Sequence, residues 1–306
     1  MGTDDDDEPR AWVLNLDADL ELAAHPRAYT PPASLRARGD AMARVLAPLL
    51  LGPRDVVVSE DERARGAARG LPGRAYSPTP NALRLLARAG AIAEPHPSVD
   101  VLRRVSSRAF AAELGATLPG EGLFTDAARA RAKLRETPPV GDAWRMKRAF
   151  GMSGRGQRVV VPGTESDADR SMIESAIAEG GVRIEPSVAI VTEYGMHALL
   201  PAGGGALRVG ALVRQTCDAR GAWLATERVT EPEPNEVAIG TALAAEIARV
   251  GAALEAAGYF GPFGVDAFTY RDARGDIALQ PRSEINARYS MGFGVGFGRA
   301  ARARAV

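Results

Sequence analysis

The sequence predicts an α/β domain at the N-terminus, followed by a two-lobed α+β region with antiparallel sheets. Strand-like and helix-like segments alternate through the first hundred residues, which is typical of a small parallel sheet. From Val99 the pattern changes to helical segments and a glycine-rich hairpin, and then to alternating or apolar runs that indicate antiparallel strands. We therefore expect three units, at residues 1–98, 99–184 and 185–306.

The first unit carries two acidic residues, Asp17 and Asp19, just after its first predicted strand. Ligands of parallel sheets gather at this edge, although a capped turn explains the two residues equally well. No G-x-G-x-x-G motif follows the strand, so no dinucleotide site is predicted there. The elements expected in this unit are a strand at 12–16, a helix at 34–51, strands at 55–58 and from Tyr76, and a helix at 81–89 capped by Asn81.

The second and third units combine helical periodicity with strand-like runs. The longest helix is expected to begin at Asn235 and to end at Gly258, because its apolar residues recur at helical spacing. The other elements expected are helices at 100–114, 126–135, 167–178 and 294–298, strands at 182–185, 189–193, 207–213 and 223–229, and a hairpin formed by 264–270 and 276–286.

Composition excludes several classes of function. The 38 basic residues balance the 38 acidic ones among 306 residues, which argues against a nucleic-acid-binding protein. One cysteine, Cys217, excludes an internal disulfide, and three separated histidines do not have metal-site spacing. No basic and apolar leader and no 18-residue apolar span is found, so we expect a cytoplasmic protein with no membrane partner.

Lys147 is one of only two lysines in the chain, the other being Lys133. It lies on a predicted strand that leads into a glycine-rich loop and a second strand, within residues 144–161. A compact ammonium beside flexible backbone amides suits a polyphosphate. The spacing is not that of a Walker loop, and a surviving lysine in an arginine-rich sequence is also consistent with chance.

Asp266, Glu284 and Asn286 form an oxygen-rich group on the last predicted hairpin. If residues 273–275 make a three-residue turn with Gly275 left-handed, Asp266 opposes residue 282 and shares a face with the other two. Carboxylate and amide oxygens suit Mg²⁺ that bridges nucleotide phosphates. A two-residue turn would instead place Asp266 on the other face, and carboxylates on strands often face water.

These motifs, taken in their order along residues 100–292, resemble the ATP-grasp superfamily, which includes biotin carboxylase, D-alanine–D-alanine ligase and glutathione synthetase. The N-terminal region is similar to the pre-ATP-grasp domain of that superfamily. The resemblance implies that Lys147 contacts the α- and β-phosphates, and that Arg288 stabilises the transferred phosphoryl group. Asp266, Glu284 and Asn286 match the metal-ligand pattern. The resemblance further implies that the phosphate-covering loop contains Gly151, Ser153, Gly154 and Gly156.

The resemblance also assigns roles to three residues whose sequence signals are weaker. Glu185 matches the hinge that holds adenine, and Glu193 matches the residue that holds the ribose hydroxyls. Arg108 stands where many members have an earlier lysine. Taken singly, each glutamate is also consistent with a strand end or a solvated edge.

The implied activity is an ATP-dependent carboxylate–amine ligase that proceeds through an acyl phosphate and releases ADP and phosphate. The implied cofactors are ATP and Mg²⁺, with Mn²⁺ as an alternative metal. The implied partners are a small carboxylic acid and an amine, an amino acid or peptide among them, and a second copy in a homodimer. Two alternatives stay open, a small-molecule kinase and a non-catalytic nucleotide-binding regulatory protein. Specificity is expected to come from Asp17, Asp19, His197, the turn at 76–80 and the segment 289–292.

Overall fold

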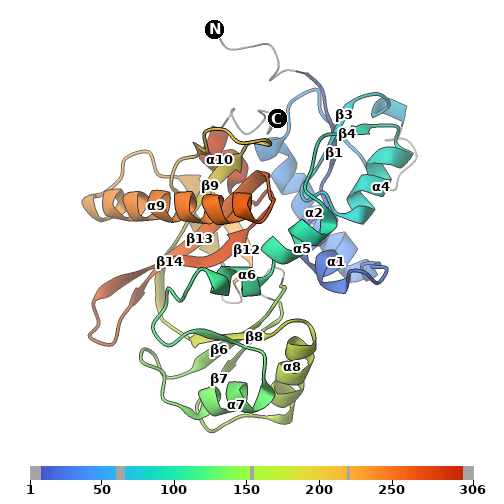
Figure 1. The fold of residues 1–306 in the computed structure, drawn as a ribbon. Coiled ribbons are helices and arrows are strands. Elements are labelled where there is room, and N and C mark those ends of the chain that lie inside the picture. The colour runs from blue at the N-terminus through green and yellow to red at the C-terminus, as the bar shows by residue number, and fades with distance from the viewer. Residues whose placement is uncertain (1–7, 60–65, 152–154, 219–220, 299–306) are drawn as a thin grey trace.

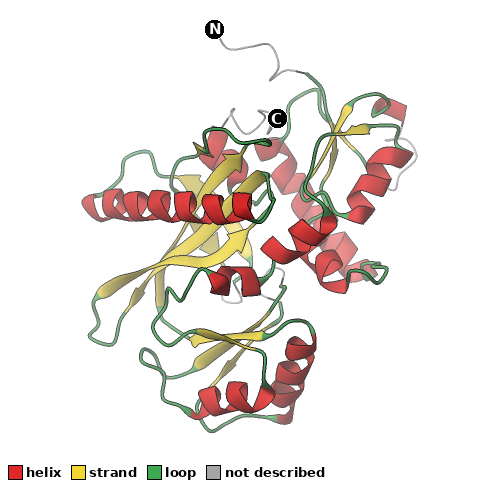
Figure 2. Ribbon diagram, viewed as in Figure 1, coloured by secondary structure: helices red, strands yellow, loops and turns green. Residues whose placement is uncertain are grey.

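The computed structural model describes residues 8–59, 66–151, 155–218 and 221–298, and these residues form three sheets (Figure 1). A four-stranded parallel sheet has the order β2-β1-β3-β4, and a four-stranded antiparallel sheet has the order β5-β8-β6-β7. The largest sheet is antiparallel with the order β12-β11-β9-β13-β14, and β10 pairs with β9. Figure 2 shows helices on the outer faces of all three sheets.

The first sheet confirms the parallel strands predicted for the N-terminal region. The third strand was placed wrongly, because Tyr76 follows the strand instead of beginning it. The observed strand is hard to recognise in the sequence, because it contains a glycine and a buried arginine, Arg74, where apolar residues would be expected. Arg74 can be buried because it forms an ion pair with Glu94 at 2.6 Å. The elements are β1 (Ala11–Val13), α1 (Ala18–Ala24), α2 (Ala33–Leu50), β2 (Val56–Val57), β3 (Pro72–Ala75), α4 (Pro80–Arg88) and β4 (Ile92–Ala93).

Two short helices connect the first two sheets where the sequence analysis expected one helix over 100–114. They are α5 (Val99–Val105) and α6 (Arg108–Glu113). The helix is interrupted because Ser107 caps the second helix, and its hydroxyl accepts a hydrogen bond from the backbone N–H of Ala109. Leu102 and Phe110 pack into the core of the largest sheet. The unit boundary at residue 99 stays a prediction, and apolar packing crosses it.

The second sheet carries the glycine-rich hairpin, and two helices cover its outer face (Figure 1). Both helices begin where predicted, because Asp126 caps one and a Ser166–Asp169 capping box begins the other. The elements are β5 (Gly122–Phe124), α7 (Ala127–Arg135), β6 (Trp144–Arg148), β7 (Gln157–Val160), α8 (Asp167–Ala178) and β8 (Val182–Pro186).

The largest sheet is built from a long central strand and the predicted C-terminal hairpin. The sequence analysis missed β11, and the run that it placed at 207–213 contributes only the short β10. The elements are β9 (Ile190–Leu200), β10 (Arg208–Val209), β11 (Val213–Cys217), β12 (Trp223–Arg228), α9 (Pro234–Ala256), β13 (Gly261–Arg271) and β14 (Ile277–Asn286).

Helix α9 lies along the largest sheet (Figure 1) and begins with a capping box formed by Glu233 and Glu236, not with Asn235 as a cap. By length and composition alone it is long and apolar enough to cross a membrane, although the sequence analysis had found no apolar span of that kind. One such helix is weak evidence of a membrane segment. Leu243 and Ile247 of this helix are fully buried in the core of the sheet.

The segment after β14 returns to the N-terminal domain and ends in α10 (Phe293–Phe297). Tyr289 and Phe293 join Trp12 and Leu46 in one apolar cluster. The backbone approach is close, since a Cβ at Gly294 would collide with the carbonyl oxygen of Leu49. Residues from both ends of the described chain therefore share one core.

Candidate functional site

A cavity of about 730 Å³ lies between the two antiparallel sheets and is closed on one side by the N-terminal domain. We call it the central cavity. Nine of the twelve residues expected to act in catalysis, nucleotide binding or metal binding line it. A tenth, Gly156, lies at the end of the glycine-rich loop, close to Arg148 and Phe150. The other two, Ser153 and Gly154, lie outside the described residues.

Lys147 projects from β6, and its ammonium forms an ion pair with Glu185 of β8 at 2.6 Å. The two strands are antiparallel neighbours, so a residue on each reaches the same face of the sheet. Burial lowers the pKa of Lys147, and the negative charge of Glu185 opposes that effect. Glu185 was expected to hold adenine, and in the structure its carboxylate holds the lysine.

Arg108 lies at the first position of α6 and faces the same part of the cavity. Its guanidinium donates to the carbonyl oxygen of Arg148 at 2.8 Å and to Glu284 at 2.5 Å. The chain passes so close at Gly151 that a Cβ there would lie 2.9 Å from the Arg108 guanidinium. Gly156, at the other end of the loop, has a φ of 75°, which a residue with a side chain adopts only with strain.

The C-terminal hairpin has the three-residue turn that the metal hypothesis required. Gly275 has a φ of 89°, and the N–H of Asp272 donates to the carbonyl oxygen of Asp276. The register then shifts, so that Asp266 opposes Glu284 instead of residue 282. Because the shift covers two residues, the face of each side chain is unchanged. The predicted partner was wrong, whereas the predicted shared face was correct.

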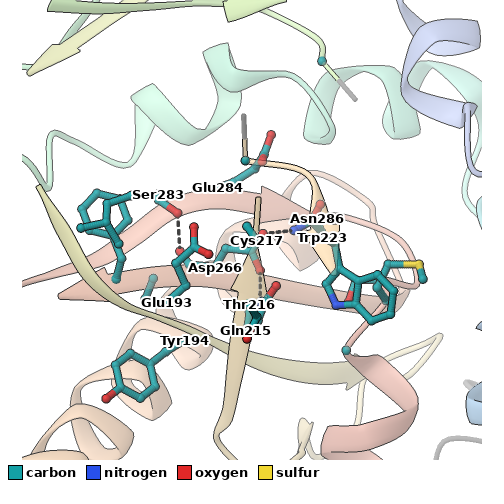
Figure 3. A pocket seen from close by; sticks show the side chains of 18 of the residues that line it. Glu193, Tyr194, Gln215, Thr216, Cys217, Trp223, Asp266, Ser283, Glu284 and Asn286 are labelled. Carbon is teal, nitrogen blue, oxygen red and sulfur yellow. Dashed lines mark hydrogen bonds between the residues drawn. The ribbon is translucent and has the colours of Figure 1, made fainter. Parts of the chain in front are cut away.

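Asp266 accepts two hydrogen bonds from primary amides, one from Gln215 at 2.9 Å and one from Asn286 at 2.8 Å (Figure 3). Burial and the nearby negative charge of Glu284 together raise the pKa of this carboxyl to about 6. Among the described residues, no lysine or arginine forms an ion pair with Asp266 within 4 Å. Two carboxylates therefore share a partly buried site, and Arg108 forms an ion pair with only one of them, Glu284.

This donor set fits a hard divalent cation. Two carboxylates and the amide of Asn286 supply oxygen ligands, and added positive charge would offset the burial of Asp266. The described residues hold no group of three or more His, Cys, Asp or Glu side chains that could bind a metal. The site therefore depends on the amide and on further oxygens that a bound phosphate or water would provide.

Glu193 lies on β9 beside Gln215 of β11 and Phe268 of β13. Figure 3 shows it in the same group of side chains as Asp266. The thiol of Cys217 also lies nearby, and burial together with Glu193 raises the pKa of that thiol. A protonated thiol is a poor nucleophile.

Arg288 is held rigidly at the N-terminal wall of the cavity. It pairs with Asp19 at 2.7 Å and donates to the hydroxyl of Tyr76 at 3.0 Å. Its guanidinium also lies over the Tyr76 ring, 5.3 Å from the centroid. Asp19, one of the two acidic residues noted after the first predicted strand, is therefore the ion-pair partner of Arg288. Burial and this ion pair act in opposite directions, and the pKa of Arg288 is raised.

His197 was expected to contribute to specificity and does not face the cavity. It is 1% exposed, and Gly264, Gly292 and Gly296 surround its ring closely. Burial lowers its pKa to about 4, so the ring is neutral at pH 7. The sequence offers no sign of this, because the glycines come from two distant segments, Gly264 from β13 and the other two from the region of α10.

Several cavity residues were missed by the sequence analysis, and each contributes to the electrostatics or shape of the site. Gln215 lies on the missed strand β11, whose alternation of apolar and polar residues is too short to stand out. The missed lining residues that enter the argument below are Leu16, Met42, Arg145, Arg155, Gln215 and Trp223, whereas Tyr76 and Met291 belong to the segments expected to contribute to specificity.

Searches by sequence find no matching family model and no similar curated protein. Solved structures do resemble the chain. Biotin carboxylase of Campylobacter jejuni, in a complex with β,γ-ATP, has a TM-score of 0.54 and 16% identity over 94% of this chain and 67% of that one.

Two further solved structures give the same result. The biotin carboxylase domain dimer of Hydrogenobacter thermophilus 2-oxoglutarate carboxylase, with MgADP, ADP and bicarbonate, has a TM-score of 0.52 and 14% identity over 97% of this chain and 69% of that one. N5-carboxyaminoimidazole synthetase of Staphylococcus aureus, with ADP, has a TM-score of 0.50 and 13% identity over 92% of this chain and 71% of that one. At such identities the likeness concerns the fold. Biotin carboxylase is one of the proteins named above as members of the superfamily that the motifs resemble, and the chain has the ATP-grasp fold.

Proposed function

We propose that the protein is an ATP-dependent carboxylate–amine ligase. The observation that carries the proposal is the convergence of Lys147, Arg108 and Arg288 with the Asp266–Glu284 carboxylate pair on one cavity. The arrangement concentrates positive charge at two walls and hard oxygen ligands between them. Such a site suits a polyphosphate with its metal ion and an acidic acceptor.

The nucleotide would lie along the second sheet and the strand that leaves it. Lys147 would contact the α- and β-phosphates, and Arg108 would take the place of the earlier lysine. Pro186, Val188 and Phe268 offer an apolar surface for the base. Glu193 is placed to accept hydrogen bonds from the ribose hydroxyls.

Arg145 and Arg155 also line the cavity near the glycine-rich loop. With Gly151 and Gly156, they would let that loop close over the phosphates and exclude water. Asp266, Glu284 and Asn286 would hold Mg²⁺, which would neutralise charge on the phosphates when it is bound. Mn²⁺ has the same ligand preference and remains an alternative.

The acceptor carboxylate would lie beside Arg288. A carboxylate oxygen would attack the γ-phosphorus, the bond to the β,γ-bridging oxygen would break, and ADP would leave. An amine would then attack the acyl carbon of the acyl phosphate, lose a proton and displace phosphate. Arg288 is pre-organised for this role, because Asp19 and Tyr76 fix its guanidinium before substrate arrives.

The test is a Mg²⁺-dependent ATP turnover assay with hydroxylamine against pooled carboxylic acids and amino acids. A hydroxamate together with ADP, both lost in Lys147→Ala, is the expected result. The matched control is Lys133→Ala, which removes the other lysine, located on α7 away from the cavity lining. ADP without hydroxamate would instead indicate a kinase, and no ATP binding at all would overturn the proposal.

The proposal also covers the oligomeric state, the cellular location and the substrates of the protein. The Hydrogenobacter structure contains a biotin carboxylase domain dimer, and we expect this chain to form a homodimer. The balance of charge supports the expectation of a cytoplasmic enzyme that binds no nucleic acid. Small acids, amino acids and peptides are the substrates to test first.

A further inference from the structure

One end of the central cavity is apolar. Leu16, from the loop after β1, Met42 of α2, Trp223 of β12 and Met291, after β14, line it. All four belong to the apolar cluster shared by the N-terminal domain and the C-terminal segment. We call this group the apolar subsite.

The apolar subsite has a rigid wall. Trp223 is partly exposed, and its indole N–H donates to the hydroxyl of Thr226 at 2.7 Å, which fixes the orientation of the ring. Leu16 and Met291 are each 8% exposed and complete the floor. A ring held in this way offers apolar contact with little loss of side-chain entropy on binding.

The apolar subsite is directly joined to the cation proposed to bind the acceptor. Tyr76 packs in the same apolar cluster, while its hydroxyl accepts a hydrogen bond from Arg288. Met291 follows Arg288 by three residues and lines the same cavity. An anionic head at Arg288 and an apolar tail on Trp223 would therefore belong to one small molecule.

We propose that the acid activated by this enzyme carries a bulky apolar or aromatic group, which packs on Trp223, Met42 and Met291. The inference rests on the proposed function for the place of the carboxylate, and on the lining of the cavity for the nature of the tail. Short or doubly charged acids would leave the apolar subsite open to water. An apolar tail should improve binding by at least about tenfold over a short acid.

Trp223 itself provides the readout. The other two tryptophans, Trp12 and Trp144, are 1% and 0% exposed, so acrylamide should quench mainly the fluorescence of Trp223. The experiment titrates the full-length protein with 3-phenylpropionate, propionate or succinate at saturating Mg-ATP. We expect 3-phenylpropionate alone to protect Trp223 from acrylamide, and to bind at least about tenfold more tightly than propionate.

Two variants and one control locate the effect. Met42→Ala keeps the fluorescent reporter and should reduce the preference for 3-phenylpropionate, and Trp223→Ala, followed by calorimetry, should remove it. Leu224→Ala is the matched control, because Leu224 is the next residue on the same strand and is 58% exposed. It should leave the preference unchanged.

The outcomes separate this proposal from the ligase proposal. Equal binding of 3-phenylpropionate and propionate, or a preference that survives in both variants, would overturn the apolar subsite even if hydroxamate forms with another acid. A preference that depends on Trp223 and Met42 supports the apolar subsite. If no hydroxamate accompanies it, the ligase chemistry fails and the binding assignment stands.

Discussion

Replacing Asp266 with asparagine is expected to make the protein more stable while it removes activity. In the metal-free protein, burial and the neighbouring Glu284 raise the pKa of Asp266 from 3.8 to about 6. That difference corresponds to about 3 kcal/mol of destabilisation when the group is ionised at pH 7.5. Asp266 is partly open to the cavity, and solvent reduces the expected gain for Asp266→Asn to about 1–2 kcal/mol.

The asparagine should fit without a lost hydrogen bond. Both current donors, Gln215 and Asn286, are primary amides, and one of them can turn to present its oxygen to the new NH₂ group. The sign of the pH effect follows from proton uptake. Between pH 4 and 6 the folded wild type binds more protons at residue 266 than the unfolded chain does, so its stability falls as pH rises through that window. The advantage of the variant should therefore be about half as large at pH 5 as at pH 7.5.

The assay is urea denaturation of both proteins in EDTA at pH 5 and pH 7.5, with ATP turnover measured separately in Mg²⁺. Addition of Mg-ATP should stabilise the wild type far more than the variant, because the variant lacks one of the two carboxylate ligands. Equal stability of the two proteins at pH 7.5, or a gain that does not depend on pH, would refute the argument that Asp266 is a strained carboxylate. Full activity in the variant would refute its role as a ligand.

Three other substitutions test the remaining charges of the site. Glu284→Ala should lower turnover at least about a hundredfold in a protein that still folds, with some loss of stability because Arg108 loses its ion-pair partner, and substantial residual turnover would count against a ligand role. Glu185→Gln should lower the pKa of Lys147 further, because it removes the charge that opposes burial; the KM for ATP should then begin to rise at a lower pH in the variant than in the wild type, and identical pH profiles would contradict this role of Glu185. Asp19→Asn should reduce the free energy of unfolding by about 2 kcal/mol and lower kcat, since Arg288 loses its charge partner; a variant with normal stability and kcat would show that the pair is dispensable.

Local signals predicted the parts of the site that lie close together in the sequence. The turn at Gly275 and the alternation of strand side chains were enough to place Asp266, Glu284 and Asn286 on one face, even though the register was off by two residues. The error has a physical cause. The irregular stretch 281–283 contains Pro281, which cannot donate a ladder hydrogen bond and which the predicted register did not take into account. Its neighbour Arg282 is buried against Glu246 of α9, a contact that the local sequence does not reveal.

Contacts between distant segments could not be predicted in this way. Asp19 and Arg288 are 269 residues apart, and only the return of the chain to the N-terminal domain brings them together. Lys147 and Glu185 were both noted, but their ion pair needs the order of strands in the second sheet, which the sequence pattern leaves open. The identity of site residues was therefore easier to predict than their partners.

The shared core of the two chain ends has a consequence for how the protein is made. Trp12 and Leu46 need Tyr289 and Phe293 to cover them, and those aromatic residues are synthesised much later than they are. During translation, part of the apolar surface of the N-terminal domain stays uncovered until those residues have emerged from the ribosome. Until then this surface is accessible to chaperones and can aggregate. The N-terminal domain can therefore complete its apolar core only when β13, β14 and the segment after them have folded. Amides of α2 should accordingly exchange with solvent only when the C-terminal segment detaches, so the two ends of the chain would open as one cooperative unit.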